Sequence, residues 1–140
     1  MPRIILQLQP DGSQTVATDE AGNAVALYLP ESAGGTQTGV RPMQMLLMGL
    51  AGCAAVDILM ILKKQRQSVS DFRVELEGDR EPNKEPSLWQ QVRIVFKFKG
   101  EVDAEKAAKA VDISMEKYCS VAETLRRGGA SLSWEVVVGE

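Results

Sequence analysis

Chemistry in this chain could come from Cys53 and Cys119, the two cysteines of a 140-residue sequence that contains no histidine. A cysteine reacts as its thiolate, which usually requires a cationic neighbour to lower the thiol pKa. Peroxide oxidises such a thiolate to a sulfenic acid, and a second thiol can condense with that group to form a disulfide. Each cysteine alone is equally explained as a small core hydrophobe, so residue types leave both interpretations open.

Composition excludes several other kinds of site. Without histidine there is no Ser-His-Asp triad, no Cys-His pair and no histidine metal ligand within one chain. Two cysteines cannot form a four-thiolate zinc site without several chains, so we expect no metal and no other cofactor. The net charge of -3 argues against a nucleic-acid partner. The few cysteines and the short, interrupted apolar run at the N-terminus predict a cytoplasmic protein.

Cys53 lies in the longest apolar run of the sequence, which could be a membrane span or a buried helix. The run extends from Met45 to Leu62 and contains Asp57. A charged side chain at the centre of a span costs about 2.5–3.5 kcal/mol, and glycine and alanine dilute the hydrophobicity of this run. The strand patterns elsewhere also need a core element to cover them. We therefore predict a buried central helix and no membrane partner.

Residue patterns predict the other elements. Apolar alternation indicates strands at 4–8, 15–18, 24–29, 72–76, 92–98 and 132–138, with loops at 30–39 and 77–86. Pro42 suits the first turn of the central helix, which we expect to end near Gln65. Asp103 is the expected N-cap of a helix over 104–111. Ser114 is the expected N-cap of a second segment that ends at Arg127.

The order β-β-β-α-β-β-α-α-β, with short turns between strands, predicts one α+β domain over residues 1–140 with mainly antiparallel pairing. The central helix has no polar face between residues 45 and 56, so it must be covered on all sides. A homodimer would supply that cover, and Gly49 and Gly52 would let two backbones approach closely. A deeply buried helix in a monomer is the alternative.

The expected surroundings of Cys53 follow from helical spacing. Its helix face also carries Leu46, Leu50, Val56, Asp57 and Met60, which are the candidate pocket residues. An ionised Asp57 one turn away would oppose a thiolate at Cys53, so an arginine must compensate. The candidates are Arg41, which lies just before the helix, and Arg126, which lies near Cys119.

Two segments together carry a family resemblance. "RPMQMLLMGLAGCAAVDILMILKK" (41–64) and "AVDISMEKYCSVAETLRRG" (110–128) resemble the OsmC-like family, which includes the organic hydroperoxide resistance proteins. The pattern combines a proline eleven residues before a helical cysteine with a second cysteine after S-x-x-K-Y. The resemblance implies an intertwined homodimer, in which antiparallel sheets built from both chains wrap around two long central helices.

The same resemblance implies a function in the oxidative stress response. It implies reduction of organic hydroperoxides, with Cys53 as attacking thiol, Cys119 as resolving thiol and a dithiol as reductant. Peroxidases of the family carry a glutamate directly after the proline, where this chain has Met43. They also carry an arginine in the N-terminal segment, often beside glycines, whereas the only arginine of that segment here is Arg3, inside a predicted strand. The alternative is a non-enzymatic dimer that binds a small ligand or senses thiol oxidation at a subunit-interface pocket.

Overall fold

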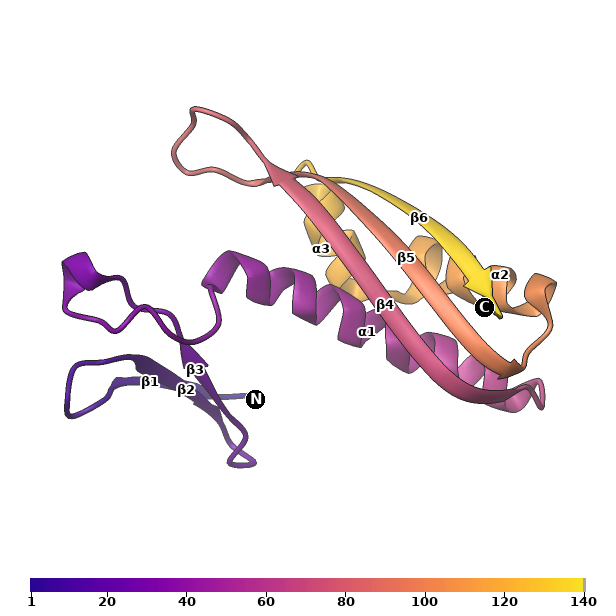
Figure 1. Cartoon of the computed structure of the whole chain (residues 1–140), viewed down its shortest axis with the longest axis horizontal. Coiled ribbons are helices and arrows are strands. Elements are labelled where there is room, and N and C mark those ends of the chain that lie inside the picture. The colour runs from indigo at the N-terminus through magenta and orange to yellow at the C-terminus, as the bar shows by residue number, and fades with distance from the viewer. Residues whose placement is uncertain (140) are drawn as a thin grey trace. The chain divides into compact units, whose positions relative to one another are not determined.

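The structure is a computed structural model that describes residues 1–139, and Figure 1 shows its elements. The chain divides into two compact units, Met1–Leu46 and the residues from Leu47 onward, which are described separately below. The elements in chain order are β1 (Ile4–Leu8), β2 (Thr15–Asp19), β3 (Ala24–Leu27), a 3-10 turn (Glu31–Ala33), α1 (Pro42–Lys64), β4 (Ser68–Arg80), β5 (Trp89–Glu101), α2 (Ala104–Ile113), a π turn (Ser114–Tyr118), α3 (Ser120–Arg127) and β6 (Ser131–Val138).

The N-terminal unit is an antiparallel meander in which β2 pairs with both β1 and β3. The turn between β2 and β3 is organised by Asp19, whose carboxylate accepts the backbone N–H groups of Ala21 and Asn23 at 3.0 and 2.9 Å. Gly22 has a φ of 90°, which glycine adopts without steric cost. The strands predicted at 15–18 and 24–29 are therefore present as a hairpin, with β3 ending at Leu27.

This meander has no core of its own. No residue from 1 to 46 is buried, and the side chains of Ile4, Leu6 and Leu8 on β1 are 65%, 58% and 55% exposed. Apolar side chains on a sheet normally gain their stabilisation by leaving water, at about 25 cal/mol per Å² of buried surface. The residues of this unit provide little of that burial among themselves.

The second unit contains a sheet with the strand order β4-β5-β6. β4 and β5 form a long antiparallel hairpin, whereas β5 and β6 are parallel. Parallel neighbours need a crossover, and α2, the π turn and α3 form it between these two strands. The prediction of mainly antiparallel pairing is confirmed for the described strands, and the β5–β6 pair is the exception. The loop prediction over 77–86 is wrong at its start, because Glu77–Arg80 continues β4 opposite Trp89–Arg93.

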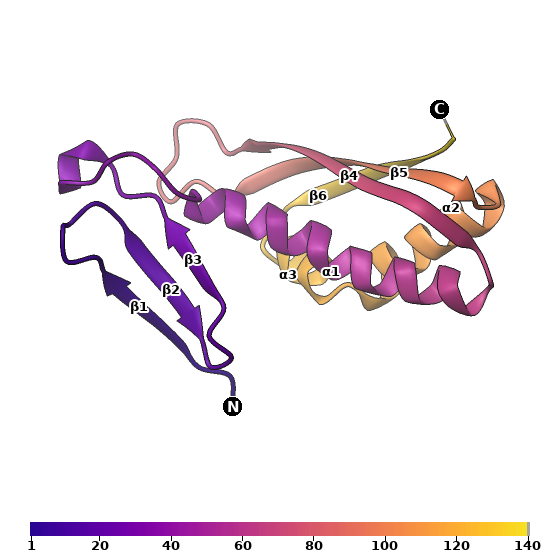
Figure 2. The ribbon, with the colours of Figure 1, turned by 60° about the horizontal axis from the view of Figure 1, so that its bottom comes forward.

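The helices of this unit lie on one face of its sheet, as Figure 2 shows. Alternate side chains of β5 point into that layer, and α1 contributes one residue per turn to it. The fully buried members, each at most 1% exposed, are Val92, Ile94, Phe96 and Phe98 from β5 and Leu50, Ala54, Ile58 and Leu62 from α1. The spacing of four residues on α1 is that of one helix face.

The opposite face of α1 is apolar and open. Met48, Val56 and Met60 are 56%, 59% and 55% exposed. A Cβ atom added at Gly49 or Gly52 would meet no other atom within 4 Å. Within residues 1–139, α1 is the one helix long and apolar enough to cross a membrane, a property that core helices of soluble proteins share. One face of α1 is buried in the core layer of this unit, and its opposite face is exposed.

The segment between α2 and α3 differs from its prediction. Asp103 caps α2 as expected, because its carboxylate accepts the N–H of Lys106. Ser114 is not an N-cap, since its φ of -60° and ψ of -53° are helical and α2 continues into the π turn. The chain leaves the helical conformation at Cys119, whose ψ is 104°. Cys119 is the N-cap of α3, and its Sγ accepts the N–H of Ala122 at 3.5 Å.

Candidate functional site

Cys53 lies on α1 at the border between the buried and the open face. Each helical residue turns by about 100° about the axis, so the neighbours one turn away fall on both sides of Cys53. Leu50, on one side, is buried, whereas Gly49 and Val56, on the other, are exposed. Cys53 is accordingly half-buried and carries a free thiol. Its side chain can be reached from the open face while it remains next to the core.

Cys119 lies beneath Cys53, inside the core layer. It is 3% exposed, and its Sγ lies 4.0 Å from the backbone oxygen of Leu50, three residues before Cys53 on α1. The thiol of Cys53 is a neighbour of the Cys119 thiol, and both thiols are free. The structure thus brings together the two cysteines that the sequence singles out. A half-buried thiol and a neighbouring buried thiol can form a disulfide after one of them is oxidised.

The environment of Cys119 keeps its thiol protonated. Burial raises the pKa of Cys119 from 9.0 to about 11, because the thiolate would lose its hydration. The backbone N–H groups of Ala122 and Val121 favour the thiolate and act against this shift, whereas the neighbouring Cys53 raises the pKa further. Cys119 is therefore suited to be the thiol that reacts second, after its partner has become electrophilic.

This shift predicts a stability change at alkaline pH. Below pH 9 the Cys119 thiol is protonated in the folded and in the unfolded chain. The raised pKa of Cys119 then contributes its full amount to the free energy of unfolding. Between pH 9 and about 11 the unfolded chain releases the proton first, and the free energy of unfolding falls as the pH rises. At about 1.4 kcal/mol per pKa unit, the total loss is at most about 3 kcal/mol.

The measurement is denaturant unfolding of the reduced protein at several pH values from 8 to 10.5. The Cys119→Ser variant lacks the thiol and is the control for all other titrating groups. We expect the wild type to lose stability more steeply than the variant in this range. Parallel stability curves for the two proteins would contradict the assignment.

The predicted arginines have other partners in the structure. The Arg126 guanidinium donates a hydrogen bond to the backbone oxygen of Met115, lies 3.6 Å from the Glu123 carboxylate and stacks 5.9 Å from the Trp134 ring centre. Arg41, in the N-terminal unit, lies 4.4 Å over the Tyr28 ring. Stabilisation of a thiolate by either guanidinium remains a prediction.

The predicted pocket residues divide between the two faces of α1. Leu50 is buried in the core layer, and the half-buried Asp57 accepts a hydrogen bond from Ser114. Val56 and Met60 lie on the open face, and Leu46, in the N-terminal unit, is 44% exposed. Another surface would have to cover the open face to complete an apolar pocket at Cys53, so the pocket also remains a prediction.

Comparisons with known proteins agree on one family. Residues 34–135 match the family model of OsmC-like proteins. The chain is also 38% identical over 121 residues to protein YhfA of Escherichia coli K12, covering 79% of this chain and 90% of that protein. The chain belongs to the OsmC-like family.

Solved structures show that its fold is that of other OsmC-like proteins. A hypothetical protein from Aquifex aeolicus has a TM-score of 0.81 and 30% identity, with 100% of this chain and 98% of that chain covered. A Legionella pneumophila structure described as an organic hydroperoxide resistance protein OsmC has a TM-score of 0.68 and 20% identity, with 97% of each chain covered. The α+β fold expected from the sequence is thereby confirmed.

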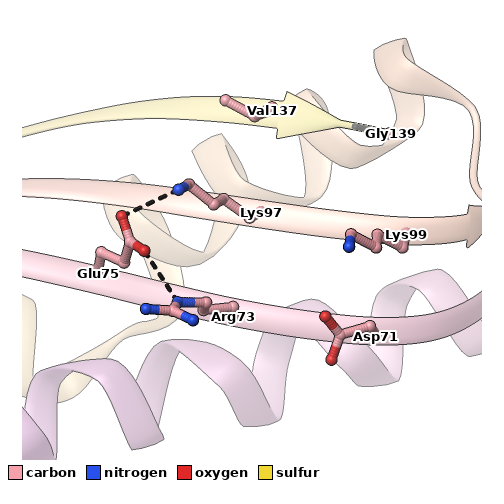
Figure 3. A pocket seen from close by; sticks show the side chains of 7 residues that line it. All are labelled: Asp71, Arg73, Glu75, Lys97, Lys99, Val137 and Gly139. Carbon is pink, nitrogen blue, oxygen red and sulfur yellow. Dashed lines mark ion pairs between the residues drawn. The ribbon is translucent and has the colours of Figure 1, made fainter.

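The outer face of the second sheet in this OsmC-like chain carries a hollow of about 510 Å³ that the sequence did not predict. Its lining, drawn in Figure 3, is Asp71, Arg73, Glu75, Lys97, Lys99, Val137 and Gly139. Glu75 pairs with Arg73 at 2.8 Å and with Lys97 at 3.1 Å, and these hydrogen bonds and charges lower its pKa. Acidic and basic side chains alternate here, which is typical of a solvated sheet face. The hollow is on the face opposite the thiols.

Sequence reasoning missed one polar contact near the thiols of this OsmC-like chain. Ser114 is fully buried, and its hydroxyl lies 3.0 Å from Oδ2 of Asp57 and 3.4 Å from the backbone oxygen of Ala54. A signal was present, because Asp57 is the one charged residue in the apolar run from Met45 to Leu62, and Ser114 is a polar residue directly after α2. Buried polar groups of this kind require partners, and each here satisfies the other.

Proposed function

We propose that this OsmC-like chain is a thiol-dependent hydroperoxide reductase that acts on organic hydroperoxides. The observation that supports the proposal is the placement of the half-buried thiol of Cys53 beside the buried, protonated thiol of Cys119, whose sulfur lies 4.0 Å from the backbone oxygen of Leu50 on the same helix as Cys53. A peroxidase that ends its cycle with a disulfide needs this asymmetry, because one thiol must meet the peroxide first and the other must wait beside it.

The reaction has two chemical steps and one regenerating step. The Cys53 sulfur attacks one oxygen of the peroxide, so an S–O bond forms, the O–O bond breaks, and the alkoxide leaves as an alcohol with a proton. The Cys119 sulfur then attacks the Cys53 sulfenic acid, so an S–S bond forms and water leaves with the thiol proton. A dithiol reductant returns the disulfide to two thiols and becomes a disulfide itself.

The proposed working unit is a homodimer in the cytoplasm. A second copy would cover the open face of α1, where Met48, Val56 and Met60 are exposed and two glycines leave room for close helix packing. It would also supply apolar surface for the exposed residues of β1. Obligate interfaces of this kind bury about 2,000 Å² or more. The pocket beside Cys53 would then be apolar, which favours alkyl hydroperoxides over hydrogen peroxide.

A specific observation supports a second candidate function on the same fold. Arg126 is bound to Met115 and Glu123, and the position after Pro42 carries Met43 instead of a glutamate. A site with less support for a thiolate suits a dimer that binds a small ligand or senses thiol oxidation slowly. The shared feature of both candidates is the pair of neighbouring thiols.

The test is peroxide consumption by the purified protein with dithiothreitol as reductant. We expect faster turnover with cumene hydroperoxide than with hydrogen peroxide, by about 10-fold or more, since apolar side chains flank Cys53. The Cys53→Ser variant should consume neither peroxide above background. Negligible turnover by the wild type with several alkyl hydroperoxides and dithiols would favour the binding or sensing candidate.

A further inference from the structure

We propose that Ser114 and Asp57 are a positioning pair that holds Cys119 against Cys53 and thereby sets how readily the two thiols form a disulfide. The proposal deepens the peroxidase function and rests on it for the biological role of the disulfide. It assigns Ser114 and Asp57 to the resolving step rather than to the attack on peroxide.

The pair connects α1 to the π turn beside the thiols. Ser114 begins that turn and is 0% exposed, and its hydroxyl donates to Oδ2 of Asp57 across a distance of 3.0 Å. Asp57 lies one helical turn after Cys53 on α1. The side chain of Ser114 is therefore anchored to the same stretch of helix that carries Cys53.

The backbone of Ser114 continues this connection to Cys119. The N–H of Cys119 donates to the backbone oxygen of Ser114 at 2.7 Å, which closes the π turn. Two hydrogen bonds in series thus run from Asp57 through Ser114 to the backbone of Cys119. A shift of Ser114 relative to α1 would move the Cys119 thiol by a similar amount.

A π turn gives this connection a particular importance. Such turns are rare, contain one more residue than an α-helical turn and occur frequently at functional sites. The wider turn here is held on one side by Ser114 and on the other by Arg126, whose guanidinium binds the backbone oxygen of Met115. Without the contact to α1, the turn could relax to the ordinary helical hydrogen-bond pattern and carry Cys119 out of reach of Cys53.

The first test is the equilibrium between dithiol and disulfide in buffers of oxidised and reduced dithiothreitol, read by thiol alkylation and mass spectrometry. In Ser114→Ala we expect the disulfide to be destabilised about 10-fold relative to the dithiol, which raises the reduction potential by about 30 mV. Asp57→Asn keeps an oxygen that can accept the Ser114 hydroxyl, so its potential should stay near the wild-type value.

The second test is kinetic and uses one equivalent of cumene hydroperoxide in the presence of dimedone, which traps sulfenic acids. Ser114→Ala should form the Cys53 sulfenic acid at the wild-type rate and give about 10-fold more trapped adduct relative to disulfide, because closure is slower. Ser120→Ala, which removes an exposed hydroxyl next to Cys119, is the matched control and should behave as wild type.

Three outcomes decide the proposal. A folded Ser114→Ala protein whose disulfide has the wild-type reduction potential would overturn the proposal. An equal shift of the reduction potential in Asp57→Asn would also overturn it, because the charge of Asp57 and not its hydrogen bond would then be the cause. If Ser114→Ala does not fold, Asp57→Ala replaces it in the redox-buffer test. We expect Asp57→Ala to destabilise the disulfide relative to the dithiol by only about 3-fold, because the Ser114 hydroxyl can still donate to the backbone oxygen of Ala54. The redox-buffer test involves no peroxide, so a shifted potential without peroxidase activity would support the pair and refute the proposed function.

Discussion

In the Cys119→Ser variant we expect peroxide turnover with dithiothreitol to fall by at least about 10-fold, because the thiol that closes the cycle acts as an intramolecular reactant. In the wild type that thiol is a neighbour of Cys53, whereas an external thiol must reach a half-buried sulfenic acid from solution. The unresolved sulfenic acid has time to react again, so excess peroxide should convert Cys53 of the variant to the irreversible sulfinic acid.

The measurement combines steady-state peroxide consumption with mass spectrometry of the protein after excess peroxide. Wild type should end as an intramolecular disulfide, Cys119→Ser as a sulfinic acid at Cys53, and Cys53→Ser as an unmodified chain. Cys119→Ala should match Cys119→Ser, although a serine can still cap α3 and an alanine cannot. Wild-type turnover and an intact Cys53 in both Cys119 variants would show that this thiol does not resolve the intermediate.

The second large effect concerns assembly. Val56→Arg should convert the proposed dimer to monomers at micromolar concentration, because a charge would be placed on the open apolar face of α1. In a two-fold symmetric interface the same substitution occurs twice, so two guanidinium groups would face each other without partners. Removing such charges from water costs several kcal/mol per ion, which corresponds to a loss of more than about 100-fold in affinity.

Sedimentation velocity of wild type and variant reports the assembly directly. Leu88→Arg is the matched control, because it places the same side chain at an apolar residue that is 42% exposed but belongs to the loop that joins β4 to β5 and not to α1. We expect the control to keep the wild-type mass. A wild type that sediments as a folded monomer, or a Val56→Arg protein that stays dimeric, would refute the proposed interface.

Local sequence patterns predicted the elements whose buried face is marked by a regular spacing of apolar residues. The alternation of apolar residues in β5 identified the inner face of its sheet, and Pro42 marked the start of α1 correctly. The parallel pairing of β6 was not predictable in the same way, because strand direction depends on the crossover and not on alternation. The π turn was not predicted from the sequence, because its residues also occur in ordinary α-helices.

The candidate site was predictable in its residue types but less so in its contacts. Cys53 and Cys119 could be paired because a family pattern contains both, and the structure places them together. The contact between Ser114 and Asp57 depends on how two helical segments are positioned along each other's axes. Residue spacing within one segment does not determine that position. The partners of Arg126 were equally hidden, because a long side chain can reach many backbone oxygens.

The lack of buried residues in the N-terminal unit has a consequence for how this protein responds to dilution. Ordering a residue costs about 1–2 kcal/mol of backbone entropy, and a unit without a core has little to offset it. If a second copy provides the missing cover, association and folding of β1–β3 become one equilibrium governed by mass action. Low concentration would then release a chain whose first third is open to proteases, so the abundance of the protein would itself control its lifetime.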